Sequence, residues 1–181
     1  MIAASPKTAI LVVGLPYTGK TTLINSLMKP YPGNKIIADQ IYLQEVSPGK
    51  VSLQHWLDYC TVLVERIKSK IIRSTEAFSF VELGIMPRTH RSQLAEWLQN
   101  DGHRVIPLWL KCENVEKIVK RRNERGGKTD NDGEHIDISL GDLYERIKNS
   151  FEEPLDDEGF VQIDTAGGLE TCIGVVTELL D

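Results

Sequence analysis

The sequence has few cysteines, no excess of positive charge and no long apolar run. Its three cysteines, Cys60, Cys112 and Cys172, are isolated and form no C-x-x-C pair, which excludes a typical zinc site or disulfide framework. The net charge of −5 argues against a dedicated nucleic-acid scaffold, since such proteins usually carry a basic face. The N-terminal segment resembles neither a signal peptide nor a membrane span. We therefore expect a cytoplasmic protein without a membrane partner.

The length and the order of the elements indicate the fold class. A chain of 181 residues suits one domain, here expected over residues 1–181. Apolar β-branched runs alternate with segments of helical periodicity, which predicts an α/β fold with a parallel sheet covered by helices on both faces. The expected strands are residues 8–13, 35–38, 78–82, 105–110 and 160–164. The expected helices include residues 22–28, 53–73 (with Ser52 as N-cap), 88–101, a basic helix from about 114, 139–151 and 169–180.

The most specific motif lies between the first strand and the first helix. Residues 14–21 read GLPYTGKT and fit G-x-x-x-x-G-K-[ST], the phosphate-binding P-loop. The glycines let the backbone curl so that its N–H groups face phosphates, and the following helix N-terminus favours anions. Lys20 is expected to reach the β- and γ-phosphates, and the Thr21 hydroxyl to ligate Mg²⁺. The predicted nucleotide-binding residues of this loop are Gly14, Leu15, Pro16, Tyr17, Thr18, Gly19, Lys20, Thr21 and Thr22.

Two acidic residues stand at the carboxyl ends of predicted strands. Asp39 follows the second strand, at the edge of the sheet where ligands of open α/β folds bind. It is our candidate for contacting a substrate hydroxyl, although a turn cap is the simpler alternative. Glu82 ends the third strand and is our candidate Mg²⁺ ligand beside Thr21, directly or through water.

Basic residues form two further groups. Arg88 and Arg91 open the helix after the third strand and are candidates for binding an anionic substrate group, although exposed arginines on helices are common. Arg121, Arg122 and Arg125 lie on the basic helix that leads into a polar, glycine-rich segment. This combination predicts a lid over residues 114–138, whose arginines stabilise charge on a transferring phosphoryl group.

Two other features are interpreted as structural. The acidic connector at residues 152–158 is expected to be a solvated turn. Trp56 and Tyr59 lie on the long helix 53–73 and are expected to be packing residues, although this helix could also wall an acceptor pocket.

These pieces together resemble a group of small P-loop kinases that includes polynucleotide 5′-kinases, gluconate kinases, zeta-toxin-like kinases and antibiotic phosphotransferases. The resemblance covers nearly the whole chain and is carried by the loop at residues 14–22, Asp39, Arg88-x-x-Arg91, the arginines 121, 122 and 125, and Phe151-x-x-Pro154 followed by Ile163-Asp164-Thr165. It implies a three-layer P-loop NTPase with five parallel strands in the order 2-3-1-4-5 and a helical lid. It also implies that the loop after Asp164 passes near adenine, which makes Thr165 a nucleotide-binding candidate.

The chain departs from that pattern at three places. Tyr17 stands where the group usually has glycine, so the backbone there must accept a side chain. Glu82 stands where aspartate is commoner, and no arginine follows shortly after Asp39 as it does in polynucleotide kinases. The last departure favours a small-molecule acceptor over a nucleic acid.

The resulting hypothesis is an ATP-dependent kinase that transfers the γ-phosphoryl of Mg-ATP to a hydroxyl of a small molecule. Its expected catalytic residues are Lys20, Asp39, Arg122 and Arg125, with Arg121 and Thr165 holding the nucleotide. Two alternatives stay open: a 5′-hydroxyl polynucleotide kinase, and an ATP-binding regulatory protein that phosphorylates no metabolite. The oligomeric state is left open.

Overall fold

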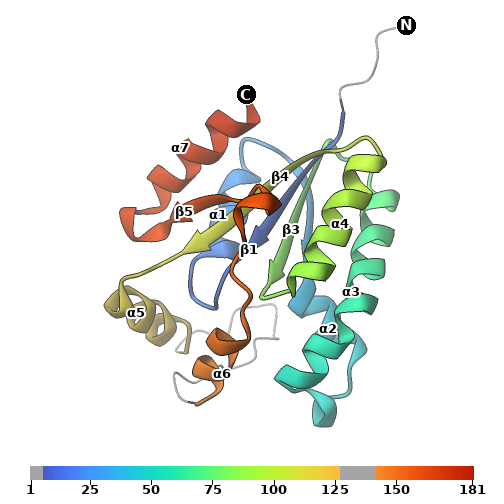
Figure 1. The fold of residues 1–181 in the computed structure, drawn as a ribbon. Helices are drawn as coiled ribbons and strands as arrows, with labels where there is room; N and C mark the ends of the chain where they lie inside the picture. The colour runs from blue at the N-terminus through green and yellow to red at the C-terminus, as the bar shows by residue number, and fades with distance from the viewer. Residues whose placement is uncertain (1–5, 127–141) are drawn as a thin grey trace, which may run out of the picture.

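The sheet has five parallel strands in the order β2-β3-β1-β4-β5, as the resemblance implies (Figure 1). The structure is a computed structural model that describes residues 6–126 and 142–181. The strands are β1 (Thr8–Val13), β2 (Gly33–Ile37), β3 (Phe78–Gly84), β4 (Arg104–Lys111) and β5 (Val161–Asp164). Each matches an expected strand to within a few residues. The predicted fold class is therefore confirmed.

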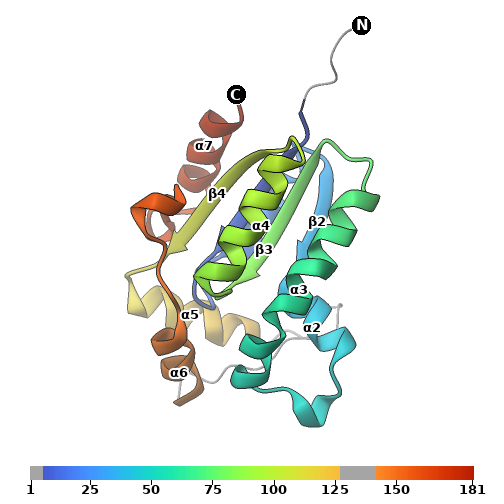
Figure 2. The same ribbon diagram turned by 45° about the vertical axis from the view of Figure 1, so that its right-hand side comes forward.

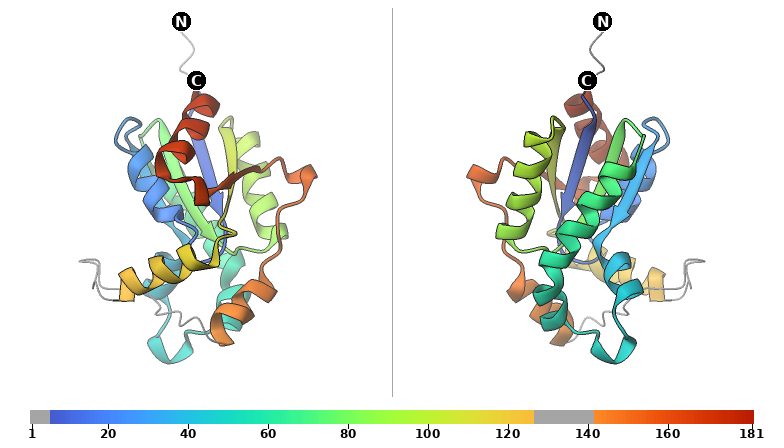
Figure 3. Two further views of the ribbon diagram at one scale, coloured as in Figure 1. Left: turned by 90° about the vertical axis from the view of Figure 1, so that its left-hand side faces the viewer. Right: turned by 90° about the vertical axis from the view of Figure 1, so that its right-hand side faces the viewer.

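Helices cover both faces of the sheet and form the outer layers (Figures 2 and 3). The helices α1 (Lys20–Leu27) and α7 (Leu169–Leu180) pack on one face, and α2 (Ala38–Glu45), α3 (Leu53–Arg73) and α4 (Arg88–Asn100) on the other. Two further helices, α5 (Val115–Gly126) and α6 (Asp142–Ser150), lie beyond the carboxyl ends of the strands (Figure 1). Among the helices in the described part of the chain, none is both long and apolar enough to span a membrane.

The side chains of the central strand β1 are buried on both faces of the sheet. In β1, Ala9, Leu11 and Val13 point into the core beneath α2, α3 and α4, whereas Ile10 and Val12 point into the core beneath α1 and α7. A strand buried on both faces reads as a continuous apolar run, which is why the sequence pattern located it accurately.

Helix α2 was not predicted from the sequence. The expected second strand ends at Ile37, and Ala38 already begins the helix, so Asp39 lies in a first helical turn. This helix has eight residues and buries Ala38, Ile41 and Tyr42, which is too short a stretch to display a helical period. A carboxylate in the first turn is favourable there because it faces the positive end of the helix dipole.

Pro107 sits inside β4, where a residue without an N–H is unusual. Its neighbour on one side is Leu11 of β1, but β5 pairs with β4 only from Leu108 onward. Pro107 therefore occupies a position with a single paired neighbour strand. The strand β4 as a whole is nevertheless an interior strand.

Candidate active site

The P-loop connects β1 to α1 in the conformation that its glycines require. Gly14 has φ of 149°, and a Cβ on it would lie 2.4 Å from the carbonyl oxygen of Leu110, so no other residue fits. Gly19 has φ of 92° and precedes the first turn of α1. The backbone N–H groups of this turn form the concave, electropositive surface to which phosphates bind.

Tyr17 adopts a left-handed backbone conformation with φ of 64°. For a residue with a side chain this conformation costs about 1–2 kcal/mol. Tyr17 thus adopts a backbone conformation that glycine takes more readily, and the loop stores local strain at this position.

Lys20 lies against its own loop. The residue is 7% exposed, and its ammonium group donates a hydrogen bond to the carbonyl oxygen of Leu15, 2.8 Å away. The same carbonyl accepts a 2.8 Å hydrogen bond from the Thr18 hydroxyl. The lysine is therefore held across the loop that is predicted to bind phosphates.

Thr21 and Glu82 meet beside the loop. The Thr21 hydroxyl donates to Oε2 of Glu82 over 2.8 Å, and the Glu82 side chain is nearly buried. The pair brings together two hard oxygen donors, the chemistry that Mg²⁺ prefers when it is bound mainly by phosphates and water. These residues therefore fit the predicted metal ion, which stays a prediction.

Asp39 lies beside Gly84, a residue that is hydrogen-bonded to the P-loop. The carboxylate is exposed, and a Cβ placed on Gly84 would lie 3.7 and 3.9 Å from its two oxygens and 4.0 Å from Cζ2 of Trp56. The carbonyl of Gly84 accepts a 3.0 Å hydrogen bond from the N–H of Gly14. We call the space in front of the Gly84 Cα, between Asp39 and Trp56, the Gly84 niche.

Arg121 joins three segments that are far apart in the sequence. Its Nη1 donates to the carbonyl of Tyr17 at 3.2 Å and to Oγ1 of Thr165 at 3.0 Å, and Nη2 donates to the carbonyl of Thr165 at 3.0 Å. Thr165 in turn donates to the carbonyl of Lys111. The two residues predicted to hold the nucleotide are thus in contact with each other and with the P-loop.

The remaining lid residues are described only in part. Arg122 is partly exposed on α5, and Lys117 of the same helix donates to the carbonyl of Ala166. The Arg125 side chain and residues 127–141 lie outside the described part of the structure, so the predicted lid over 114–138 stays a prediction.

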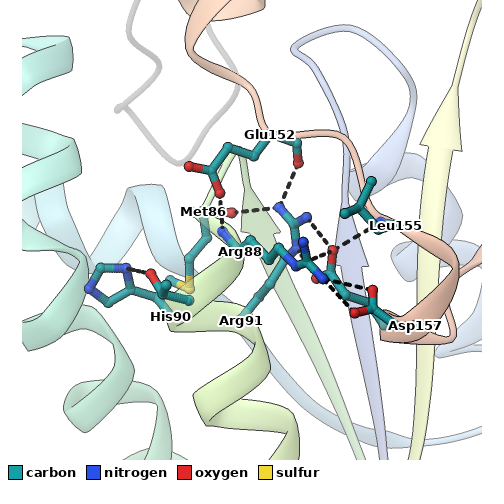
Figure 4. A network of polar contacts seen from close by, with 9 residues as sticks. Met86, Arg88, His90, Arg91, Glu152, Leu155 and Asp157 are labelled. Atoms are coloured by element: carbon teal, nitrogen blue, oxygen red, sulfur yellow. Dashed lines mark hydrogen bonds and ion pairs between the residues drawn. The ribbon is translucent and has the colours of Figure 1, made fainter.

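Arg88 and Arg91 form a network with the acidic connector instead of lining an open site (Figure 4). Arg91 is fully buried and pairs with Glu158 through Nε and Nη2, at 2.6 and 2.7 Å. Its Nη1 donates to the carbonyls of Met86 and Glu152. Arg88 pairs with Asp157 at 2.6 Å, on the surface. These contacts favour a structural role for both arginines over the predicted role in binding an anionic substrate.

The acidic connector is correspondingly not the solvated turn that the sequence suggested. The Glu158 side chain is 5% exposed. Burial raises its pKa, but the hydrogen bonds from Arg91 and from the Leu155 N–H, with the charges of Arg91 and Arg88, lower it below its ordinary value overall. Glu152 accepts from the first N–H of α4 and so caps that helix. A run of acidic residues in a loop does not reveal from sequence that one of these side chains is buried.

Solved structures with a similar fold include several proteins that are named as kinases. A sugar kinase from Janibacter sp. HTCC2649 superposes with a TM-score of 0.70 at 19% identity, covering 97% of this chain and 95% of that one. A gluconokinase from Sinorhizobium meliloti 1021 gives 0.61 at 18%, covering 94% and 89%. A shikimate kinase from Acinetobacter baumannii, in complex with shikimate, gives 0.61 at 14%, covering 96% and 93%. No protein-family profile and no curated protein sequence matches the chain. The chain therefore shares its overall fold with these three kinases.

Proposed function

We propose that the protein is an ATP-dependent kinase that transfers the γ-phosphoryl group of Mg-ATP to a hydroxyl of a small molecule. The observation that carries the proposal is the position of Asp39. Its exposed carboxylate lies at Gly84, whose carbonyl is hydrogen-bonded to the first residue of the P-loop. A general base is needed beside the terminal phosphate, where an acceptor hydroxyl must lie. The neighbours named as sugar, gluconate and shikimate kinases support a small acceptor.

In this proposal each group has one role in the transfer. Asp39 accepts the proton as the substrate oxygen bonds to the γ-phosphorus, and the bond to the bridging oxygen breaks to release ADP. Lys20 and the P-loop N–H groups hold the phosphates in line and stabilise their charge. Arg122 and Arg125 add positive charge from α5, while Arg121 and Thr165 hold the nucleotide between the P-loop and the segment after β5.

The proposed metal is Mg²⁺, held by Thr21 with Glu82. When bound, it would neutralise charge on the β- and γ-phosphates. The 2.8 Å hydrogen bond between the two side chains orients the Thr21 hydroxyl for this task.

Transfer of labelled phosphate from [γ-³²P]ATP tests the proposal, with a panel of sugars, polyols and hydroxy acids and with a 5′-hydroxyl oligonucleotide as acceptors. Lys20→Ala is expected to weaken Mg-ATP binding in calorimetry and to abolish transfer. Asp39→Asn is expected to lower transfer by about 10²- to 10⁴-fold with ATP affinity unchanged. Asp58→Asn is the matched control, because Asp58 is exposed on α3 and accepts from Gln54.

Three results would count against the proposal. Transfer to the oligonucleotide alone would identify a polynucleotide kinase, and tight ATP binding without transfer to any acceptor would indicate the regulatory alternative. An Asp39→Asn variant with full transfer would reduce Asp39 to a structural residue of the first turn of α2.

A further inference from the structure

Trp56 carries a buried polar group that the fold leaves without a partner. The side chain is 5% exposed, and within the described residues its indole N–H has no hydrogen-bond acceptor. A buried donor normally finds an acceptor, since leaving it unpaired is unfavourable. A phenylalanine could fill the same apolar surroundings without that cost, so the N–H is the feature to explain.

The unpaired N–H adjoins the part of the indole ring that faces the Gly84 niche. In an indole ring Nε1 and Cζ2 are bonded to the same carbon, and Cζ2 lies 4.0 Å from where a Gly84 Cβ would be. The Asp39 oxygens lie 3.7 and 3.9 Å from the same point. Asp39 is exposed, whereas Gly84 and Trp56 are buried, so the niche has one exposed wall and one buried wall.

Gly84 keeps this space open. The residue has φ of 60°, which favours glycine, and its missing side chain would point between Asp39 and Trp56. The same residue is hydrogen-bonded to Gly14 of the P-loop. One residue therefore ties the niche to the phosphate end of the nucleotide site.

The charges around the niche indicate which acceptors it tolerates. Asp39 is a carboxylate, and the indole N–H is a neutral donor. Arg88 and Arg91, which open the next helix, are engaged with Asp157 and Glu158. An acceptor carboxylate placed here would be repelled by Asp39, and neither of these arginines offers it a partner. A neutral oxygen avoids repulsion by Asp39 and can accept a hydrogen bond from the indole N–H.

We propose that Trp56 is a second polar anchor of the acceptor site, whose indole N–H donates to an oxygen of a neutral polyhydroxyl acceptor while the reacting hydroxyl faces Asp39. The inference rests on the proposed kinase function and narrows its acceptor to uncharged polyols and sugars. Trp56 is thus a specificity-determining residue of the acceptor site, and the packing role expected from the sequence is only part of its contribution.

Two measurements test the assignment. The first is phosphoryl transfer from [γ-³²P]ATP to glycerol, erythritol, D-ribose and D-glucitol, compared with D-gluconate and shikimate. Trp56→Phe is expected to lower kcat/KM for the neutral acceptors by roughly 10- to 100-fold with KM for ATP unchanged, because the acceptor oxygen loses its donor. Trp97→Phe is the matched control, since Trp97 lies on α4 beneath Lys68.

The second measurement follows the indole ¹H–¹⁵N resonance of Trp56, assigned by its loss in Trp56→Phe, in protein saturated with Mg-ADP. The four neutral probes are expected to move this resonance downfield, and the two carboxylates to leave it unmoved. A preference for the carboxylates, an unchanged kcat/KM in a folded Trp56→Phe variant, or no shift with any neutral probe would overturn the inference. Lys20-dependent transfer to a carboxylate or an oligonucleotide would overturn it while leaving a kinase function standing.

Discussion

The guanidinium of Arg91 and the carboxylate of Glu158 form a two-pronged ion pair, with N···O distances of 2.6 and 2.7 Å, although 67 residues separate them in the chain. Their side chains are 0% and 5% exposed. The pair attaches the connector between α6 and β5 to the first turns of α4 (Figure 4). Its position beside the carboxyl ends of the strands makes it a support of the site, not a part of it.

Removing one member of this pair is expected to destabilise the fold strongly. Arg91→Met keeps the length of the side chain but leaves Glu158 buried without its partner, so we expect a loss of about 3–5 kcal/mol in the free energy of unfolding. Urea unfolding followed by circular dichroism measures it. Arg88→Met is the comparison, because the Arg88–Asp157 pair is more exposed and Arg88 approaches Glu158 only at 3.6 Å, so its loss should cost less than the loss of Arg91. Equal effects of the two variants would contradict the structural ranking.

The same pair predicts a pH dependence of stability. The folded-state pKa of Glu158 lies below its ordinary value near 4.5, so its contribution is fully present above that value. It is lost as the pH falls through the folded-state pKa, because protonation then favours the unfolded chain. We expect the stability difference between wild type and Glu158→Gln to be constant from pH 7 to about 5 and to shrink below about 4.5. A stability difference that grows as the pH falls would contradict a lowered folded-state pKa of Glu158.

Arg121 is expected to contribute to nucleotide binding. Arg121→Ala removes the donor that joins the Tyr17 carbonyl to Thr165, and we expect KM for ATP to rise about 10-fold, as for a lost charge-assisted hydrogen bond. Lys117→Ala is the control, because Lys117 also ties α5 to the segment after β5, but among the described residues its ammonium group bonds only the carbonyl of Ala166. Steady-state kinetics with varied ATP compares them. An effect of Lys117→Ala as large as that of Arg121→Ala would mean that α5 acts only through its anchoring.

Glu82 is expected to set the magnesium requirement. Glu82→Gln keeps an oxygen that can accept from Thr21 but removes the negative charge, so the Mg²⁺ concentration for half-maximal activity should rise about 10- to 100-fold. Glu65→Gln is the matched control, with the same change in charge on the exposed face of α3. Magnesium titration of phosphoryl transfer at fixed ATP gives the values. An unchanged midpoint in Glu82→Gln would assign Glu82 to orienting Thr21 alone.

Local patterns in the sequence determined the strands, most helices and the nucleotide-binding loop. The continuous apolar run at residues 8–13, the 3–4 spacing over residues 53–73 and the spacing of Gly14, Gly19, Lys20 and Thr21 each reflect a constraint within one segment. Ser52 is an example at single-residue level, since its hydroxyl accepts from the N–H of His55 as the predicted N-cap. Such constraints act over a few residues, so they are visible without the fold.

Only the tertiary structure decided which side chains meet. Arg91 and Glu158 were interpreted as a substrate ligand and a solvated acid, yet both are buried because α4 and the connector bring opposite charges together from 67 positions apart. Trp56 was interpreted as a packing residue of an amphipathic helix. Only the structure shows that its indole N–H lacks an acceptor among the described residues and that the ring lies near Gly84 and Asp39. Hydrophobic periodicity records whether a residue is buried. It cannot record what a buried polar atom faces, because that depends on long-range packing.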